Sequence, residues 1–247
     1  MKGKIFVVGI GPGDYDYLTT RAKNSLKDSD IIVGYSSYIK LIKPFFPEKE
    51  YISSGMTKEV ERCNQCIDYA KGGKVVSLIS SGDPGIYGMA GILLELITKT
   101  KEEIYVEVVP GVTSYLAAAS LLGSPITEDH VVISLSDLLI PWEIIENRIH
   151  CAGKGDFVIC IYNPKSKGRR EQIFKTREIL LSYMDLNTPV GIVKNAMRDG
   201  QKVIITDINE MLEHEIDMST LIIIGNSRTY VKDNFMITPR GYNIWFF

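Results

Sequence analysis

Short apolar runs alternate along the first half of the chain with longer segments whose apolar residues recur every three or four positions. The runs predict buried β-strands, and the longer period predicts amphipathic helices. The predicted strands are residues 5–8, 30–34, 75–79 and 105–109. The predicted helices are residues 18–27, 35–42, 57–71, 89–98 and 114–122. Because strands and helices alternate, we predict a largely parallel sheet with covering helices.

The second half shows similar patterns but does not repeat the first. A cluster of Gly, Ser and Pro at 122–127 predicts a linker, which divides the chain into domains 1–123 and 124–247. The predicted strands that follow are residues 131–135, 157–162, 190–193, 203–206 and 220–224. The predicted helices are residues 141–148, 168–184 and 207–214. The fold class is therefore α/β, with two unlike α/β domains.

Loops rich in Gly and Pro follow three of the first-half strands. They are Gly9–Asp14, Ser80–Gly88 and Pro110–Tyr115. Ligands bind where loops leave the carboxyl ends of parallel strands, and glycines allow a ligand to approach the backbone. The alternative is three ordinary turns, because short connections in α/β domains are often rich in Gly. The three loops together favour a ligand site.

The first of these loops also invites comparison with dinucleotide-binding domains. Asp14 occupies the third glycine position of the G-x-G-x-x-G fingerprint, and the second predicted strand ends at Gly34 without a ribose-binding acid. Pro12 removes a backbone donor that a pyrophosphate would use. The sequence therefore argues against a Rossmann dehydrogenase.

Composition narrows the class of protein further. The 247 residues carry 28 basic and 30 acidic side chains, a net charge of −2, and 45% of them are hydrophobic. A general nucleic-acid binder would show a basic excess, so nucleic acid is not an expected partner. No apolar run has the length of a membrane span and the N-terminus lacks a signal-peptide pattern, so we expect a cytoplasmic protein without a membrane partner.

Two of the four cysteines, Cys63 and Cys66, have the C-x-x-C spacing of metal and redox sites. A second such pair is missing, and the chain has only three histidines. Cys63 shares a helical stripe with Val60, Ile67 and Ala70, which favours a core position for these thiols. We therefore expect no metal site.

The three glycine-rich loops contain motifs that resemble those of the tetrapyrrole methyltransferase family. These motifs are G-I-G-P-G-D at 9–14, S-G-D-P-G-I-Y-G at 81–88 and P-G-V-T-S at 110–114. The resemblance extends from Gly3 to Tyr242. It implies two α/β domains with S-adenosylmethionine in a cleft between them, a fold that differs from that of Rossmann methyltransferases, and a homodimer.

Within that family, the second half resembles the precorrin-3B C17-methyltransferases of cobalamin biosynthesis. The segments that carry this likeness are 161–170, 188–196, 225–227 and 238–242. It implies methylation of C17 of precorrin-3B or its cobalt form, with contraction of the macrocycle. The alternatives are another corrin-precursor methyltransferase, a relative of diphthine synthase, and a ligand-binding relative without turnover.

The resemblance and the chemistry of the ligands together nominate site residues. The predicted cofactor-binding residues are Gly11, Pro12, Gly82, Asp83, Ile86, Thr113, Ser114, Tyr162, Asn195 and Gly225. Tyr162, Asn195 and Gly225 come at or just after the ends of predicted strands of the second half, and we expect them at matching strand ends. The predicted substrate-binding residues are Asn163, Lys165, Ser166, Arg169, Arg170 and Arg198. The cations among them suit the carboxylates of a tetrapyrrole. Single surface charges are more often simply solvated, and it is their clustering beside the predicted pocket loops that favours a binding role.

Ring contraction moves protons and calls for an acid or a base, but the sequence does not identify it. The nominees are Asp14, Asp83, Ser36, Ser37, Thr113, Asn163 and His130. Asp83 lies in the central loop, where it would equally serve by accepting backbone hydrogen bonds within its Asp-Pro-Gly turn. The catalytic residue is left open.

Overall fold

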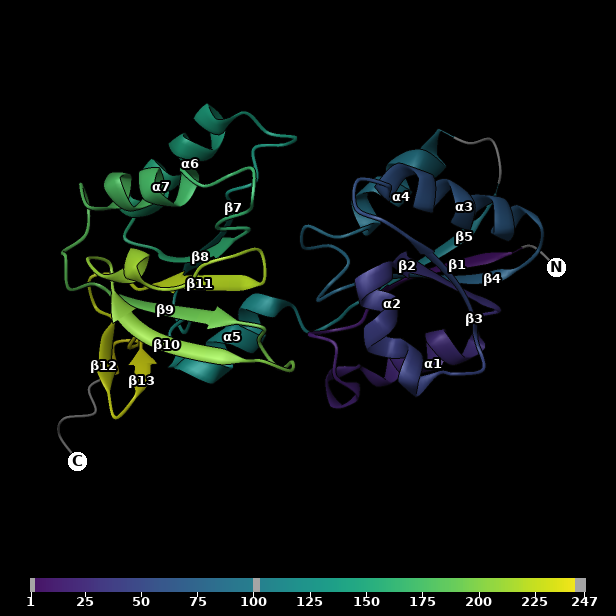
Figure 1. Cartoon of the computed structure of the whole chain (residues 1–247), viewed down its shortest axis with the longest axis horizontal. Helices are drawn as coiled ribbons and strands as arrows, with labels where there is room; N and C mark the ends of the chain where they lie inside the picture. The colour runs from purple at the N-terminus through teal and green to yellow at the C-terminus, as the bar shows by residue number, and fades with distance from the viewer. Residues whose placement is uncertain (1–2, 100–102, 243–247) are drawn as a thin grey trace. The chain divides into compact units, whose positions relative to one another are not determined.

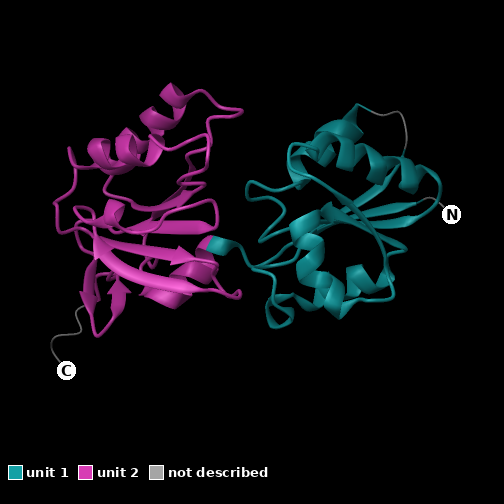
Figure 2. Cartoon of the chain, in the orientation of Figure 1, with its two compact units in different colours: residues 1–114 teal, residues 115–247 magenta. Residues whose placement is uncertain are grey.

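The computed structural model describes residues 3–99 and 103–242. The chain forms two compact units, residues 1–114 and 115–247 (Figure 2). The first unit contains one sheet and the second contains two. Among the described residues, no helix combines the length and the apolar character needed to cross a bilayer.

The first unit contains a five-stranded parallel sheet in the order β3-β2-β4-β1-β5. Its strands are β1 (Lys4–Gly9), β2 (Ile31–Tyr35), β3 (Glu50–Ser54), β4 (Val75–Ser80) and β5 (Tyr105–Val109). The predicted parallel sheet is confirmed. The sequence did not predict β3, because this edge strand buries none of its five residues fully and so lacks an apolar run.

Helices cover both faces of this sheet (Figure 1). On one face lie α1 (Thr20–Asp28) and α2 (Ser36–Ile42), and on the other lie α3 (Glu59–Lys71) and α4 (Ala90–Thr98). Successive strand residues point to opposite faces, so Ile5 and Val7 pack under α3 and α4 while Phe6 and Val8 pack under α1 and α2. Short 3-10 turns at Tyr15–Tyr17 and Lys43–Phe45 complete the unit.

The main sheet of the second unit is mixed, in the order β10-β9-β11-β8-β7. Its strands are β7 (His130–Ser134), β8 (Val158–Tyr162), β9 (Pro189–Lys194), β10 (Lys202–Asp207) and β11 (Thr220–Ile224). Only β7 and β8 pair in parallel; β11 runs antiparallel to both β8 and β9. The carboxyl ends of β7, β8 and β9 therefore share one edge with the start of β11, and β11 ends at the opposite edge.

Helices α6 (Trp142–Lys154) and α7 (Gln172–Leu180) pack on one face of the mixed sheet, and α5 (Ser114–Leu122) packs on the other. The boundary between the units falls at residue 114 instead of the predicted 123, because Ala118 and Leu122 of α5 pack against Cys160 and Ile223 of the second sheet. The predicted linker contains a strand, β6 (Gly123–Ser124). This strand joins β13 (Phe235–Ile237) and β12 (Tyr230–Lys232) in a small third sheet.

The helix predicted at 207–214 is wrong, since only a 3-10 turn, η3 (Met211–Glu213), forms there. The Asp207 carboxylate accepts a hydrogen bond from the Glu210 N–H at 2.9 Å, the bond that an N-cap residue makes, but only the 3-10 turn follows it. The guanidinium of Arg177 binds the carbonyl oxygens of Ile208 at 2.7 Å and Asn209 at 3.0 Å. Tertiary contacts therefore use the backbone groups that a helix would need.

Candidate functional site

The loops that follow β1 and β4 are joined through their backbones. The Gly11 N–H donates to the Gly82 carbonyl oxygen at 3.1 Å, and the Gly82 N–H donates to the Gly11 carbonyl at 2.8 Å. Both residues have positive φ, 61° and 66°, in the left-handed region that glycine adopts without strain. This conformation makes the two loops one rigid piece of backbone.

The loop after β5 packs directly against this pair. A Cβ on Gly111 would lie 2.3 Å from the Gly82 carbonyl oxygen, and a Cβ on Gly9 would lie 2.7 Å from the same atom. Neither distance is tolerable, so glycine is required at both positions. We predicted from the sequence that such glycines allow close approach of a ligand, whereas at these positions the close approach is between loops.

Asp83 ties the second loop to the third. Its Oδ1 accepts a hydrogen bond from the Gly85 N–H at 2.8 Å, and its Oδ2 accepts one from the Gly111 N–H at 3.0 Å. Both carboxylate oxygens therefore bind backbone amides, as in the turn role considered for this residue. Contact of Asp83 with a cofactor stays a prediction.

The remaining predicted residues of the first unit lie on the same three loops. Pro12 and Thr113 are buried, whereas Ile86 is 38% exposed. Tyr87, beside Ile86, is 56% exposed and has a φ of 51°, a conformation that is costly for an aromatic residue. Ser114 begins α5. This group of loops, residues 9–14, 81–88 and 110–114, is called the loop cluster below.

The acid and base nominees near the loop cluster make local structural bonds. Asp14 accepts a hydrogen bond from the Asp16 N–H at 2.9 Å and caps the following 3-10 turn. The Ser36 hydroxyl donates to the Ser54 carbonyl oxygen at 3.1 Å. In the second unit, His130 Nδ1 lies 3.1 Å from the Glu128 carbonyl oxygen. None of these contacts assigns an acid or a base, so the catalytic residue remains unassigned.

In the second unit, Asn163 and Asn195 directly follow β8 and β9 at the shared edge of the sheet. Both have left-handed backbones, with φ of 51° and 50°, which asparagine tolerates better than most residues. Asn163 Nδ2 donates to the Ser134 hydroxyl at 2.8 Å. The Asn195 N–H donates to the Ser219 carbonyl oxygen at 3.1 Å. The two asparagines therefore join the ends of β7, β8 and β9 to the segment before β11.

Tyr162 and Gly225 differ from the prediction in their surroundings. The Tyr162 hydroxyl accepts a hydrogen bond from the Tyr115 N–H at 3.1 Å, so it satisfies an amide in the first turn of α5. Gly225 lies at the opposite edge of the sheet, where its N–H donates to the Pro189 carbonyl at 2.8 Å. The expectation that Gly225 shares a strand end with Tyr162 and Asn195 is wrong, because β11 runs antiparallel to β8 and β9.

Arg169, predicted from the sequence to be a substrate-binding cation, is buried, with 6% of its surface exposed. Its Nη2 donates to the Asn163 carbonyl oxygen at 2.9 Å and lies 3.4 Å from the Met218 sulfur. Its Nη1 lies 3.4 Å from the Ser136 hydroxyl. Burial lowers the pKa of Arg169, and the nearby Asp137 carboxylate opposes this. Arg169 thus connects the loop after β7, the loop after β8 and the segment before β11.

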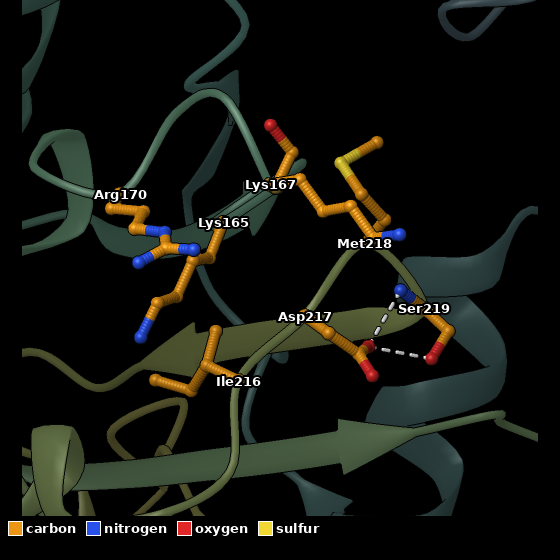
Figure 3. A pocket seen from close by; sticks show the side chains of 8 residues that line it. Lys165, Lys167, Arg170, Ile216, Asp217, Met218 and Ser219 are labelled. Carbon is orange, nitrogen blue, oxygen red and sulfur yellow. Dashed lines mark hydrogen bonds between the residues drawn. The ribbon is translucent and has the colours of Figure 1, made fainter.

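A pocket of about 540 Å³ opens at this edge (Figure 3). It is lined by Lys165, Ser166, Lys167, Arg170, Ile216, Asp217, Met218 and Ser219. The ends of Lys165 and Arg170 point to the same side of the pocket, whereas Asp217 turns toward Ser219 (Figure 3). Arg198 lies in the turn after β9, where its N–H donates to the Asn195 carbonyl at 3.0 Å, and does not line this pocket.

Sequence reasoning missed residues 216–219, which form one wall of the pocket. They precede a strand, whereas every site residue predicted from the sequence lies at or after the end of one. The reversed direction of β11 brings this segment to the edge where β8 and β9 end. Recognising the antiparallel pairing of β9 and β11 would have revealed it.

Asp217 is the one carboxylate among the pocket residues, and its charge is balanced within the unit. Lys194 Nζ lies 2.7 Å from Asp217 Oδ2 and 2.6 Å from Glu215 Oε1, and Lys202 Nζ lies 3.3 Å from Glu215 Oε2, so two cations face two carboxylates. Burial raises the pKa of Asp217, but hydrogen bonds from Lys194 and Ser219 outweigh that effect and lower the pKa to about 2. The cations Lys165, Lys167 and Arg170 therefore determine the charge that the pocket presents to a ligand.

The buried thiols behave as core residues. Cys63 and Cys66 are both 0% exposed and pack between α3 and the first sheet, which confirms the core position predicted for them. Burial raises the pKa of Cys63 to about 11 and that of Cys160 to about 12, so both stay protonated at neutral pH. Across residues 3–99 and 103–242, no cluster of three or more His, Cys, Asp or Glu side chains is arranged to hold a metal ion.

Comparison with known proteins identifies the family. Residues 4–212 match the family model of the tetrapyrrole (corrin/porphyrin) methylases. The chain belongs to the tetrapyrrole methylase family. The predicted family and fold class are thereby confirmed, and the loop cluster carries the three motifs on which the prediction rested.

Among curated tetrapyrrole methylases, the chain is 48% identical to the probable cobalt-factor III C(17)-methyltransferase of Salmonella typhimurium. That match covers 96% of this chain and 99% of the Salmonella protein. The chain is also 47% identical to the cobalt-factor III methyltransferase of Priestia megaterium. There the match covers 98% of this chain but only 46% of the longer Priestia protein.

Solved structures of tetrapyrrole methylases agree with this assignment. The crystal structure of the methyltransferase CobJ superposes with a TM-score of 0.89 at 32% identity and covers 96% of this chain and 100% of that one. A uroporphyrin-III C-methyltransferase from Thermus thermophilus, solved in complex with S-adenosylhomocysteine, superposes with a TM-score of 0.69 at 25% identity. That match covers 90% of this chain and 97% of the Thermus chain.

Proposed function

We propose that this protein is an S-adenosylmethionine-dependent methyltransferase that methylates C17 of a corrin precursor in cobalamin biosynthesis, with associated ring contraction. The observation that carries the proposal is the match to a Salmonella protein named as a probable cobalt-factor III C(17)-methyltransferase. The two sequences are 48% identical, and the match covers 96% of this chain and 99% of the Salmonella protein. The substrate is cobalt-factor III or its relatives precorrin-3B and cobalt-precorrin-3B. We propose further that the enzyme is a cytoplasmic homodimer.

The loop cluster has the composition expected of a site for S-adenosylmethionine. It lies at the carboxyl edge of a parallel sheet and combines rigid backbone amides, the hydroxyls of Thr113 and Ser114, and the exposed apolar side chain of Ile86. S-adenosylmethionine supplies a methyl group activated by a sulfonium. The residues proposed to hold it are Gly11, Pro12, Gly82, Asp83, Ile86, Thr113 and Ser114, with Tyr162 and Asn195 from the second unit; Gly225 is withdrawn from this set. The bound S-adenosylhomocysteine of the Thermus enzyme supports the choice of cofactor.

The pocket in the second unit suits the carboxylates of a tetrapyrrole. Lys165, Lys167 and Arg170 line it, and an arginine fork binds both oxygens of a carboxylate. Asn163, Ser166 and Arg198 remain in the proposed substrate set because they lie on the loops at the same edge. Arg169 contributes by holding that edge in place, as its burial and three contacts support.

Methyl transfer needs alignment more than acid catalysis. A nucleophilic ring carbon displaces the thioether in line, so one carbon–carbon bond forms as the carbon–sulfur bond breaks. Holding two reactants in line supplies roughly 7–11 kcal/mol of the barrier in well-oriented reactions. Rigid supports of the kind provided by the paired glycine loops and by Arg169 favour such alignment.

Incubation with S-adenosylmethionine and an enzymatically prepared tetrapyrrole tests the proposal. The substrates are cobalt-factor III and precorrin-3B in separate reactions, followed by mass spectrometry of the tetrapyrrole and quantification of S-adenosylhomocysteine. We expect a gain of one methyl group and an equal amount of S-adenosylhomocysteine with at least one substrate. No methyl gain with either, from protein that binds S-adenosylmethionine, would overturn the proposal in favour of a non-catalytic ligand-binding protein.

A further inference from the structure

Two adjacent leucines stand exposed on the loop that joins β7 to α6. Leu138 is 79% exposed and Leu139 is 94% exposed. Exposed apolar side chains are common when they are scattered, but two consecutive leucines at the tip of one loop form a local apolar surface. The two residues are called the apolar tip below.

The base of this loop is held firmly. The Leu135 N–H donates to the Tyr162 carbonyl oxygen at 3.0 Å, and the Ser136 N–H donates to the Ser134 hydroxyl at 3.2 Å. The Asp137 carboxylate accepts a hydrogen bond from Gln172 Nε2 at 2.7 Å. The apolar tip follows Asp137 directly, so its exposed position is set by an anchored backbone.

The same contacts connect the apolar tip to the basic loop after β8. Arg169 reaches the Ser136 hydroxyl from that loop, and Gln172 begins the helix that follows it. Because β7 and β8 are parallel neighbours, their following loops leave the same edge of the sheet. An apolar surface and the cations Lys167 and Arg170, both exposed, are thus presented by adjacent loops.

This combination matches one kind of ligand. A tetrapyrrole has a broad apolar macrocycle and a rim of carboxylates, so it needs apolar contact and cations close together. Cations on one loop and leucines on the next provide both. A neutral bilayer surface would use the leucines but would leave the cations of the pocket without an anionic partner. A second copy of the chain carries carboxylates of its own, and the molar mass measured below distinguishes it from a tetrapyrrole.

We propose that the apolar tip packs against the macrocycle of the tetrapyrrole substrate while Lys165, Lys167 and Arg170 bind its carboxylates, so that Leu138 and Leu139 help determine substrate specificity. The proposal rests on the proposed function, because it takes the tetrapyrrole as the ligand. It adds a substrate-contacting element that none of the family motifs contains.

The test compares the double variant Leu138→Ser, Leu139→Ser with the control Leu186→Ser. Leu186 is 53% exposed and precedes β9, which places it at the opposite edge of the same sheet. KM for cobalt-factor III, S-adenosylmethionine affinity by calorimetry and molar mass by light scattering are measured for each. We expect KM to rise roughly 10-fold or more in the double variant, with cofactor affinity and molar mass unchanged, and no change in the control.

A charge pair at one position provides a second readout that loss of folding cannot imitate. Leu139→Asp places a carboxylate where the proposal puts an anionic ligand, whereas Leu139→Lys places a cation there. We expect KM to rise more for the Asp variant than for the Lys variant. Equal effects of the two charges on KM would contradict the proposal. So would a KM within about twofold of wild type in the double Ser variant. A change in molar mass that accompanies the KM change would contradict it as well.

Failure of this proposal can be told apart from failure of the proposed function. Wild-type turnover tests the function, and the variants test the apolar tip. If the wild type transfers no methyl group, titration of cobalt-factor III by its visible absorbance replaces KM. Weaker binding in the double Ser variant would then still support the apolar tip, and unchanged binding would overturn it.

Discussion

The loop cluster of the first unit and the pocket edge of the second differ in the groups that form them. The loop cluster consists largely of backbone: Gly11 and Gly82 pair through their amides, and Gly111 packs against them. The pocket edge consists of side chains, with three cations around the pocket and a buried arginine behind it. A site formed by closely packed backbone has no room for an added side-chain atom. In a site formed by side chains, each substitution removes only the contacts of one residue.

This difference predicts where substitutions act. Changes in the loop cluster should alter folding and cofactor binding together, because one backbone arrangement serves both. Changes at the pocket edge should separate substrate binding from stability. The four predictions below test this comparison, in order of decreasing expected effect.

Gly111→Ala should have the largest effect. Its Cβ would lie 2.3 Å from the Gly82 carbonyl oxygen, so the loops must separate, at a cost of about 3 kcal/mol of stability and most of the cofactor affinity. Thermal unfolding and calorimetric titration with S-adenosylmethionine measure both. The matched control is Gly91→Ala in α4, where a Cβ would meet no heavy atom within 4 Å and alanine should stabilise the helix by about 1 kcal/mol. Similar behaviour of the two variants would refute the loop packing described here.

Asp83→Ala should come next, because it leaves the Gly85 and Gly111 amides without their carboxylate acceptor. Hydrogen bonds to charged groups contribute about 1.5–3 kcal/mol each, so we expect a loss of about 3 kcal/mol in unfolding free energy and weaker cofactor binding. Asp83→Asn keeps one acceptor oxygen and should lose about half as much. Unchanged S-adenosylmethionine affinity in Asp83→Ala would show that the loop does not support the cofactor.

Arg169 and Arg170 are neighbours in sequence with opposite expected behaviour. Arg170→Ala removes a pocket cation and should raise KM for the tetrapyrrole about 10-fold without changing the melting temperature. Arg169→Ala removes a buried side chain with three contacts and should lower the unfolding free energy by about 2 kcal/mol. Urea unfolding and steady-state kinetics on both variants check the pair. Loss of stability in Arg170→Ala, or none in Arg169→Ala, would reverse the assignment.

The smallest predicted effect is a loss of folding stability at low pH. The pKa of Asp217 is lowered from 3.8 to about 2, so its carboxylate stabilises the folded state fully above its ordinary pKa and loses that effect as pH falls toward 2. Because Asp217 is 42% exposed, the stabilisation should be below about 1 kcal/mol. Urea unfolding of wild type and Asp217→Asn at decreasing pH should show a difference that is constant near neutrality and shrinks below pH 3.8. A difference that grows in acid would contradict the ion pair.

The sequence predicted the first unit better than the second, for physical reasons. In a parallel sheet every strand ends at the same edge, so motifs after β1, β4 and β5 had to meet. In the mixed sheet that rule fails, which is why Gly225 was misplaced and residues 216–219 were missed. Burial of Arg169 could not be predicted either, because its partners Ser136 and Met218 are distant in sequence. Similarly, the failure of residues 207–214 to form a helix could not be predicted, because Arg177, which binds the backbone of this segment, is distant in sequence.

The position of methylation tests the central claim most directly. The enzyme is supplied with S-adenosylmethionine labelled with ¹³C in its methyl group, together with cobalt-factor III, and the product is examined by NMR spectroscopy. We predict one enriched methyl resonance, assigned to C17. Enrichment at any other ring carbon would contradict the claim and would make the protein a different corrin-precursor methyltransferase of the same family.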